Sequence, residues 1–323
     1  MFIDHHFKAP WWLRNAHLQT ITAKWLRRNA YLASIKQVVE LPDNDFIELA
    51  WTEKPKSNNH KPIIVLLHGL AGSIDSHYIK GMLAAIKQKG WIGVLMHFRG
   101  CGEQQNRQGR SYHSGATEDI DYISQYLQKK YQQSPFALIG FSLGGNVAVR
   151  YLAQSQNNPY QAACIICAPL QLANCSQRMN QGFAKNYQKY LLQTLKTSTK
   201  EKICHKKITH ISQDTLNKIT NLYDFDQQVT APLNGFTSAE DYYQQASGLP
   251  LLDKISRPCL LIHANDDPFL DHNDALTTPI NNSKLEFAIS QHGGHLGFIS
   301  GNNLFKPNYW LEQRIPTFLG KYL

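Results

Sequence analysis

The chain has 323 residues, of which 42% are hydrophobic and 18% charged, and its formal net charge is +9. This composition is typical of a globular protein and excludes a disordered, collagen-like or coiled-coil chain. No stretch approaches the roughly 20 apolar residues that cross a bilayer, and the N-terminal MFIDHHFKAPWWLRN has neither the apolar core nor the cleavage site of a secretory signal. We therefore expect a soluble, cytoplasmic protein.

The positive charge is spread along the chain. Its densest groups are residues 24–28 and 200–207, and neither is a long basic block. We interpret them as solvated helix faces, with weak peripheral attraction to an anionic membrane as the alternative. No nucleic-acid partner is expected.

Eight short runs have the composition of strands, and helical patterns separate most of them. In chain order the predicted strands are residues 35–41, 46–51, 62–68, 91–98, 135–141, 162–169, 258–263 and 284–289, and the predicted helices are 76–89, 114–131, 145–154 and one from about 308. The first two runs alternate, as an antiparallel edge hairpin does, whereas several later ones are almost continuously apolar. The pattern predicts an α/β fold with a mostly parallel sheet of about eight strands, flanked by helices, in a single domain over residues 1–323.

Residues 171–248 interrupt this alternation with a polar, helical pattern. The segment lies between two apolar strands and is predicted to be a helical cap, or lid, at the carboxyl ends of the strands, where open α/β sheets bind ligands. One set of apolar residues in it has the spacing of a helix face. These residues are Phe183, Tyr187, Tyr190, Leu191, Leu192 and Leu195. Packing on the body is the favoured interpretation, and lining an acyl pocket is the alternative.

Gly140, Ser142 and Gly144 form a G-x-S-x-G motif directly after an apolar strand and before a helical pattern. This is the setting of a nucleophile elbow, in which a strained turn exposes the serine hydroxyl. Glycines at both ends remove side chains that would clash with the turn, and the helix N-terminus faces the developing oxyanion. We therefore predict that Ser142 is a catalytic nucleophile.

A serine nucleophile needs a histidine base, and the base needs a carboxylate, in the chain order Ser, Asp, His. Asp266 and Asp267 follow the strand at 258–263, and we prefer Asp267 because it directly precedes a proline. His292 and His295 follow the last strand, and we prefer His295 because glycines flank it. Asp266 and His292 remain alternatives.

The oxyanion hole needs two backbone N–H donors. Leu143 follows the nucleophile, and Leu70 lies in the glycine-containing loop after the strand at 62–68. We predict that these two residues supply the donors. The neighbouring His68 is interpreted as a structural hydrogen-bonding residue.

Cys164 and Cys167 form a C-x-x-C motif, which is typical of redox or zinc sites. Both lie in a predicted strand, where positions three apart point to opposite faces, so we interpret them as core residues. No second such motif, dinucleotide loop, phosphate-binding loop or HExxH motif is present in the sequence. We expect no metal and no organic cofactor.

Ten further motifs resemble one known family. They are residues 15–20 (NAHLQT), 68–72 (HGLAG), 97–101 (HFRGC), 112–115 (YHSG), 223–226 (YDFD), 230–232 (TAP), 235–236 (GF), 241–243 (DYY), 266–269 (DDPF) and 292–298 (HGGHLGF). Together with the elbow, they resemble the YheT-like esterases of the α/β-hydrolase superfamily over nearly the whole chain. The resemblance implies a triad at Ser142, Asp267 and His295, and activity on medium-chain acyl esters, acylglycerols or phospholipids as a class.

These observations predict a serine hydrolase that cleaves a small-molecule carboxylic ester through an acyl-enzyme. Acyl transfer to an alcohol and amide hydrolysis could use the same triad. A non-catalytic binding protein with this fold is the alternative from another class. The oligomeric state and the physiological substrate are left open by the sequence.

Overall fold

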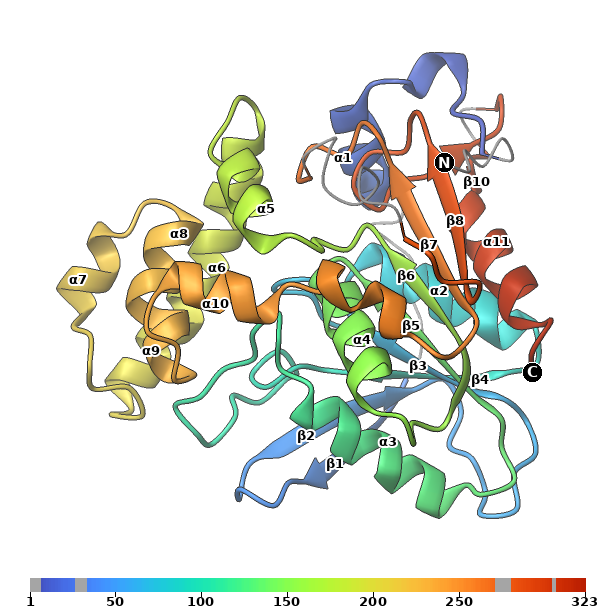
Figure 1. The fold of residues 1–323 in the computed structure, drawn as a ribbon, viewed down its shortest axis with the longest axis horizontal. Coiled ribbons are helices and arrows are strands. Elements are labelled where there is room, and N and C mark those ends of the chain that lie inside the picture. The colour runs from blue at the N-terminus through green and yellow to red at the C-terminus, as the bar shows by residue number, and fades with distance from the viewer. Residues whose placement is uncertain (1–6, 27–33, 271–279, 304–305) are drawn as a thin grey trace.

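The computed structural model describes residues 7–26, 34–270, 280–303 and 306–323 (Figure 1). Residues 27–28 of the first basic group and the first six residues of the N-terminal segment lie outside this part of the chain. None of the helices in the described ranges combines the length and apolarity needed to span a bilayer.

The core of the fold is an eight-stranded sheet with the order β1-β2-β4-β3-β5-β6-β7-β8. The strands are β1 (Ile35–Glu40), β2 (Phe46–Trp51), β3 (Ile63–Leu67), β4 (Ile92–Met96), β5 (Phe136–Phe141), β6 (Tyr160–Ile166), β7 (Cys259–Ala264) and β8 (Leu285–Ser290). β2 pairs antiparallel with both β1 and β4, and the remaining neighbours pair parallel. The predicted mostly parallel sheet of about eight strands, with its antiparallel edge hairpin, is confirmed.

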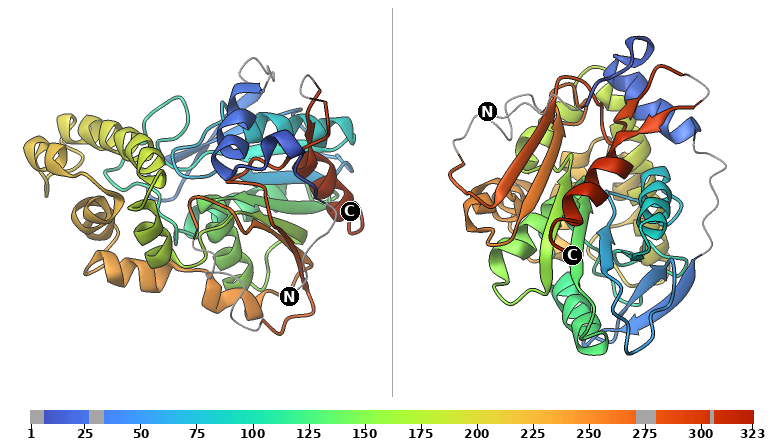
Figure 2. Two further views of the ribbon diagram at one scale, coloured as in Figure 1. Left: turned by 90° about the horizontal axis from the view of Figure 1, so that it is seen from above. Right: turned by 90° about the vertical axis from the view of Figure 1, so that its right-hand side faces the viewer.

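Alternate residues of each central strand face opposite cores. In β3, Val65 packs in one core with α3 (Glu118–Lys130) and α4 (Leu143–Gln154). Its neighbour Leu66 packs in the other, with α2 (His77–Gln88) and α11 (Trp310–Leu319). Every residue of β3 is buried, which explains its continuous apolar sequence. Figure 2 shows helices on both faces of the sheet. The predicted helices on both faces are confirmed.

Some boundaries differ from the prediction for identifiable reasons. The strand predicted to reach residue 169 ends at Ile166, because Cys167 has a φ of 48°, which a strand does not allow. The helix η1 (Trp11–Leu13) and helix α1 (Ala16–Leu26) were not predicted. In α1 only Gln19 and Ala23 are buried, so the helix has no apolar stripe to reveal it.

The segment at 171–248 is helical, as its pattern predicts. It contains α5 (Leu172–Met179), α6 (Ala184–Cys204), α7 (Gln213–Lys218), α8 (Leu222–Phe225), the π-helix η2 (Asp226–Thr230), α9 (Ala231–Leu233) and α10 (Ala239–Ala246). We call residues 171–248 the insertion. Its helices extend to one side of the sheet (Figure 1), and two apolar clusters lie inside it.

The insertion leaves and rejoins the body at neighbouring residues. The N–H of Leu249 donates to the carbonyl of Leu170 at 3.0 Å, and the buried side-chain amide of Asn146 in α4 binds the backbone of Ala246 and Gly248. A second attachment lies at the end of α6, where the buried Lys202 ammonium donates to a body loop, including the hydroxyl of Ser111 at 2.8 Å. These bonds hold the insertion over the carboxyl ends of the strands.

Candidate active site

Ser142 occupies the turn between β5 and α4. Its φ of 51° is rare for a residue with a side chain, and its N–H donates to the carbonyl of Ile166 at 2.8 Å. A Cβ on Gly140 would lie 2.5 Å from the carbonyl oxygen of Gly144, and a Cβ on Gly144 would lie 2.5 Å from that of His68. Both positions therefore require glycine, because backbone atoms cannot move aside as a side chain can. The strained turn presents the Ser142 hydroxyl to the pocket.

The structure brings Ser142, His295 and Asp267 into one hydrogen-bonded chain. The Ser142 Oγ lies 3.0 Å from His295 Nε2, and His295 Nδ1 lies 2.8 Å from Asp267 Oδ2. Asp267 is only 2% exposed, so the imidazole has a buried carboxylate as its partner. These distances allow the histidine to take a proton from the serine while the carboxylate orients the ring.

Asp266 and His292 form a separate pair beside this chain. Asp266 Oδ2 lies 3.3 Å from His292 Nδ1, and Asp266 Oδ1 accepts the N–H of Gly294 at 2.9 Å. Neither side chain forms a hydrogen bond with Ser142 in the described residues. Asp266 thus holds the loop that carries His295.

Two residues around His295 were not singled out from the sequence. The N–H of His295 donates to Thr20 Oγ1 of α1 at 2.9 Å, and the ring of Phe269 stacks on the imidazole at 4.0 Å between centroids. Both belong to segments that contributed to the family resemblance, namely residues 15–20 and 266–269. A conformational role could not be inferred there, because it requires contacts between distant parts of the chain.

The loop after β3 places backbone N–H groups beside Ser142. The N–H groups of Gly69 and Ala71 donate to the hydroxyls of Tyr78 and Tyr112, at 2.9 and 2.8 Å. Between them, the N–H of Leu70 has no acceptor among the described residues. The N–H of Leu143, at the start of α4, likewise has no acceptor in the ranges that the structure describes. The two predicted donors both lie on the pocket and are available to a substrate oxygen.

His68 is fully buried and supports this loop. Its Nδ1 lies 2.7 Å from the carbonyl of Gly69, and its Nε2 accepts the N–H of Phe98 at 3.1 Å. Burial lowers the pKa of His68 to about 3, so the ring is neutral at physiological pH. These bonds agree with its interpretation as a structural residue.

Buried histidines predict that the protein is destabilised by acid. Burial lowers the pKa of His68 to about 3, and those of His113 and His263 to about 4, from 6.5. Below pH 6.5 the unfolded chain binds protons that the folded chain excludes. The free energy of unfolding should then fall, by roughly 1.4 kcal/mol per pH unit for each histidine, until the pH approaches the folded-state pKa. Urea denaturation at about pH 7 and about pH 5 measures this, and an unchanged midpoint would contradict it.

Cys167 lies behind the triad. The Cys167 Sγ, a carboxylate oxygen of Asp267 and a ring nitrogen of His295 lie within 4.8 Å of one another, close enough to be considered as ligands of one metal ion. Zinc binds thiolates, but burial raises the pKa of the Cys167 thiol well above its usual value, and His295 Nδ1 is already bonded to Asp267. The cluster therefore fits a hydrogen-bonded triad better than a metal site.

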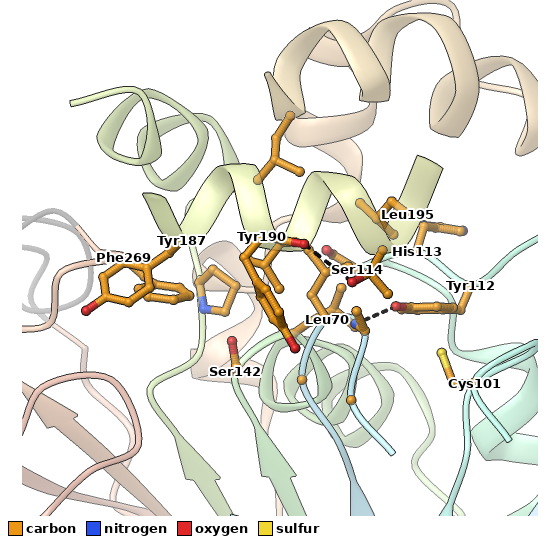
Figure 3. Close-up of a pocket in the computed structure, with 18 of the residues that line it drawn as sticks. Leu70, Cys101, Tyr112, His113, Ser114, Ser142, Tyr187, Tyr190, Leu195 and Phe269 are labelled. Atoms are coloured by element: carbon orange, nitrogen blue, oxygen red, sulfur yellow. Dashed lines mark hydrogen bonds between the residues drawn. The ribbon is translucent and has the colours of Figure 1, made fainter. Parts of the chain in front are cut away.

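A pocket of about 910 Å³ lies between the insertion and the body, and Ser142, His295, Leu70 and Leu143 line it. Its lining is mainly apolar. Figure 3 shows Tyr187, Tyr190 and Leu195 of α6 across the pocket from Ser142.

The predicted apolar face of α6 is divided between two environments. Tyr187, Tyr190, Leu191 and Leu195 line the pocket, whereas Leu192 packs inside the insertion. Packing on the body, the favoured interpretation, is confirmed for Phe183 and Tyr187, whose rings contact His17 and Phe269. Lining a pocket, the position named in the alternative, applies to Tyr187 as well and to the three other residues. One apolar face of α6 lines the pocket. Sequence periodicity cannot distinguish such a face from one that packs in a core.

Comparisons with known proteins agree with this architecture. The protein-family model described as "alpha/beta hydrolase fold" matches residues 62–302 of the sequence. The chain is 42% identical to the Escherichia coli (strain K12) protein named "Putative esterase YheT", over 96% of this chain and 91% of that protein. It is 25% identical to Phospholipase ABHD3 of Homo sapiens, over 90% of this chain and 73% of that one.

A solved structure shares the fold at lower sequence identity. The Pyrococcus furiosus esterase Pf2001 superposes with a TM-score of 0.57 and 16% identity, covering 91% of this chain and 93% of that one. This likeness concerns the fold alone. The family model and the 42% identity over almost the whole length together show that the chain belongs to the YheT-like branch of the α/β-hydrolase family.

Proposed function

We propose that the protein hydrolyses carboxylic esters through a covalent acyl-enzyme, with Ser142 as nucleophile. The observation that supports this most directly is the chain of hydrogen bonds from Ser142 through His295 to Asp267 at the base of an apolar pocket. A solvated serine would need neither a buried histidine–carboxylate pair nor a strained backbone. Membership of a family with a relative named as an esterase agrees with the proposal.

In the proposed acylation, His295 Nε2 takes the proton of Ser142 as Oγ attacks the ester carbonyl. The carbonyl oxygen becomes an oxyanion, which accepts hydrogen bonds from the N–H groups of Leu70 and Leu143. Asp267 keeps the Nδ1 proton of His295 in place and stabilises the imidazolium. The tetrahedral intermediate then collapses, and His295 gives its proton to the alcohol that leaves.

Deacylation repeats these roles with water as the nucleophile. His295 removes a proton from water, the oxyanion forms again in the same hole, and Ser142 leaves with the proton that His295 returns. The carboxylic acid is the second product. Because water and a second alcohol could both attack the acyl-enzyme, the same steps also describe transfer to an alcohol.

The pocket favours an ester with a substantial apolar group. A volume of about 910 Å³ lies at the upper end of the usual range for small-molecule sites, and its lining is mainly apolar. The similarity to a protein named as a phospholipase is compatible with lipid esters. We propose medium-chain acyl esters, including lipid esters, as the substrate class.

Fluorophosphonate labelling tests the proposal, with mass spectrometry to locate the adduct. We expect the adduct on Ser142, and turnover of p-nitrophenyl esters that rises from acetate towards medium chain lengths. A matched amide and an added alcohol separate ester hydrolysis from amidase and transferase activity. A folded protein that neither labels nor turns over any ester would overturn the proposal and favour a binding protein.

A further inference from the structure

Large apolar side chains are exposed beside the pocket, on α1 and at the start of α6. Trp25 is 72% exposed and Tyr190 is 62% exposed, and both also line the pocket. Leu18 and Leu26 of α1 and Phe183, which precedes α6, are exposed as well. We call these five residues the rim. Single exposed apolar residues are ordinary, but a cluster of this kind marks an interaction surface.

The two helices that carry the rim contact each other, although they are far apart in the sequence. The ring of His17 in α1 lies 4.5 Å from the ring of Phe183, and its Nδ1 lies 3.2 Å from the Tyr187 hydroxyl. The ammonium of Lys24 lies 4.8 Å from the ring centre of Tyr190.

Exposed lysines flank the rim on both helices. Lys24, Lys185 and Lys189 are exposed on the same two helices, and none of them forms an ion pair within the described residues. The sequence contains no Asp or Glu between Asp4 and Glu40, or between Asp121 and Glu201. The rim therefore combines exposed aromatic rings with lysines that no neighbouring carboxylate on these helices neutralises.

We propose that the rim docks on the surface of an anionic phospholipid bilayer and brings the pocket opening against it. Trp and Tyr rings are favoured at the level of lipid headgroups, and lysines beside them are attracted to anionic lipids. Because Trp25 and Tyr190 border the pocket, a lipid could pass from the bilayer towards Ser142 along apolar side chains. The docking extends the proposed function by naming bilayer lipid as the source of substrate. The cleavage of that lipid rests on the proposed function, whereas binding to the bilayer does not.

Vesicle binding tests the docking without catalysis, using the Ser142→Ala protein so that no lipid is consumed. Co-sedimentation with phosphatidylcholine vesicles is compared with vesicles that also contain about 30% phosphatidylglycerol. We expect at least about tenfold tighter binding to the anionic vesicles at low salt, a blue shift of tryptophan emission, and loss of most of this preference at about 0.5 M NaCl.

Two matched charge reversals locate the surface. Lys185→Glu/Lys189→Glu should weaken binding to anionic vesicles at least about thirtyfold, because two charges of the wrong sign then face the bilayer. Lys56→Glu/Lys129→Glu makes the same change in net charge away from the rim and should weaken it less than about threefold. Trp25→Ala should weaken it about fivefold. Turnover is measured in protein that retains Ser142. There the Lys185→Glu/Lys189→Glu variant should keep its turnover of a soluble short-chain ester, since neither lysine lines the pocket.

Several results would overturn the docking. Equal binding to neutral and anionic vesicles would do so, as would equal losses in the two charge-reversal variants. A dimer in sedimentation velocity that Trp25→Ala converts to monomer, without vesicle binding, would assign the rim to self-association instead. Fluorophosphonate labelling is measured separately: labelling without vesicle binding refutes only the docking, and vesicle binding without labelling refutes only the hydrolase.

Discussion

Replacing Ser142 with alanine is expected to lower kcat/KM for a p-nitrophenyl ester about 10⁶-fold and to abolish fluorophosphonate labelling. The loss is this large because the Oγ that forms the acyl-enzyme is removed, while His295 and the free N–H groups can stabilise only slow attack by water. The thermal midpoint should change little, since alanine occupies the same strained turn without adding bulk. Steady-state kinetics on ester and differential scanning fluorimetry measure the two effects.

A matched control removes a different serine hydroxyl from the same pocket. Ser114 lines the pocket, and its backbone N–H and carbonyl remain hydrogen-bonded to Tyr242 and Asn146 when the hydroxyl is removed, so Ser114→Ala should keep both labelling and most of the activity. Retained labelling in Ser142→Ala would mean that another residue is the nucleophile. A thermal midpoint lowered by many degrees would mean that the loss of activity reflects unfolding.

Replacing Asp267 with asparagine is expected to lower kcat about 10⁴-fold without unfolding the protein. The amide has nearly the shape of the carboxylate, but it carries no charge and can hold His295 in the wrong tautomer. Asp266→Asn is the matched variant at the adjacent position. It should lose no more than about tenfold, because Asp266 accepts the N–H of Gly294 and supports the loop instead of the imidazole.

Kinetics and thermal midpoints of both variants, measured at several pH values, decide between the two aspartates. If Asp266→Asn lost as much kcat as Asp267→Asn, the two carboxylates would act as one unit and the assignment of a single orienting residue would fail. If neither variant lost activity, His295 would not depend on a carboxylate.

The fold could be predicted because continuous runs of apolar residues correspond to strands that are buried on both faces. The continuous apolar runs at β3, β4, β5 and β7 are buried along their whole length, and the alternating run at β1 forms the edge. The elbow could also be located, since both of its glycines are required by contacts within a few residues or with the adjacent strand. Local patterns were sufficient wherever local sterics determine the structure.

The rest depends on contacts that no local pattern reveals. Asp266 and Asp267 are neighbours in the sequence, but their side chains bind different histidines. Asp266 pairs with His292 and Asp267 with His295, a difference that the sequence does not show. Thr20 reaches His295 from the opposite end of the chain. The pocket-facing side of α6 resembles a core-facing side, because apolar periodicity does not distinguish a cavity from packed side chains.

The hydrogen bond between Leu249 and Leu170 also bears on how substrate preference can diverge within this architecture. The chain departs and returns at almost the same point, so the entropy of closing the intervening segment depends only weakly on its length. Insertions, deletions or whole exchanges of residues 171–248 can therefore reshape the pocket roof without changing the register of β6 and β7. The sheet keeps its strand pairing while the helices above it are exchanged, so pockets of different shape can form over an unchanged Ser142.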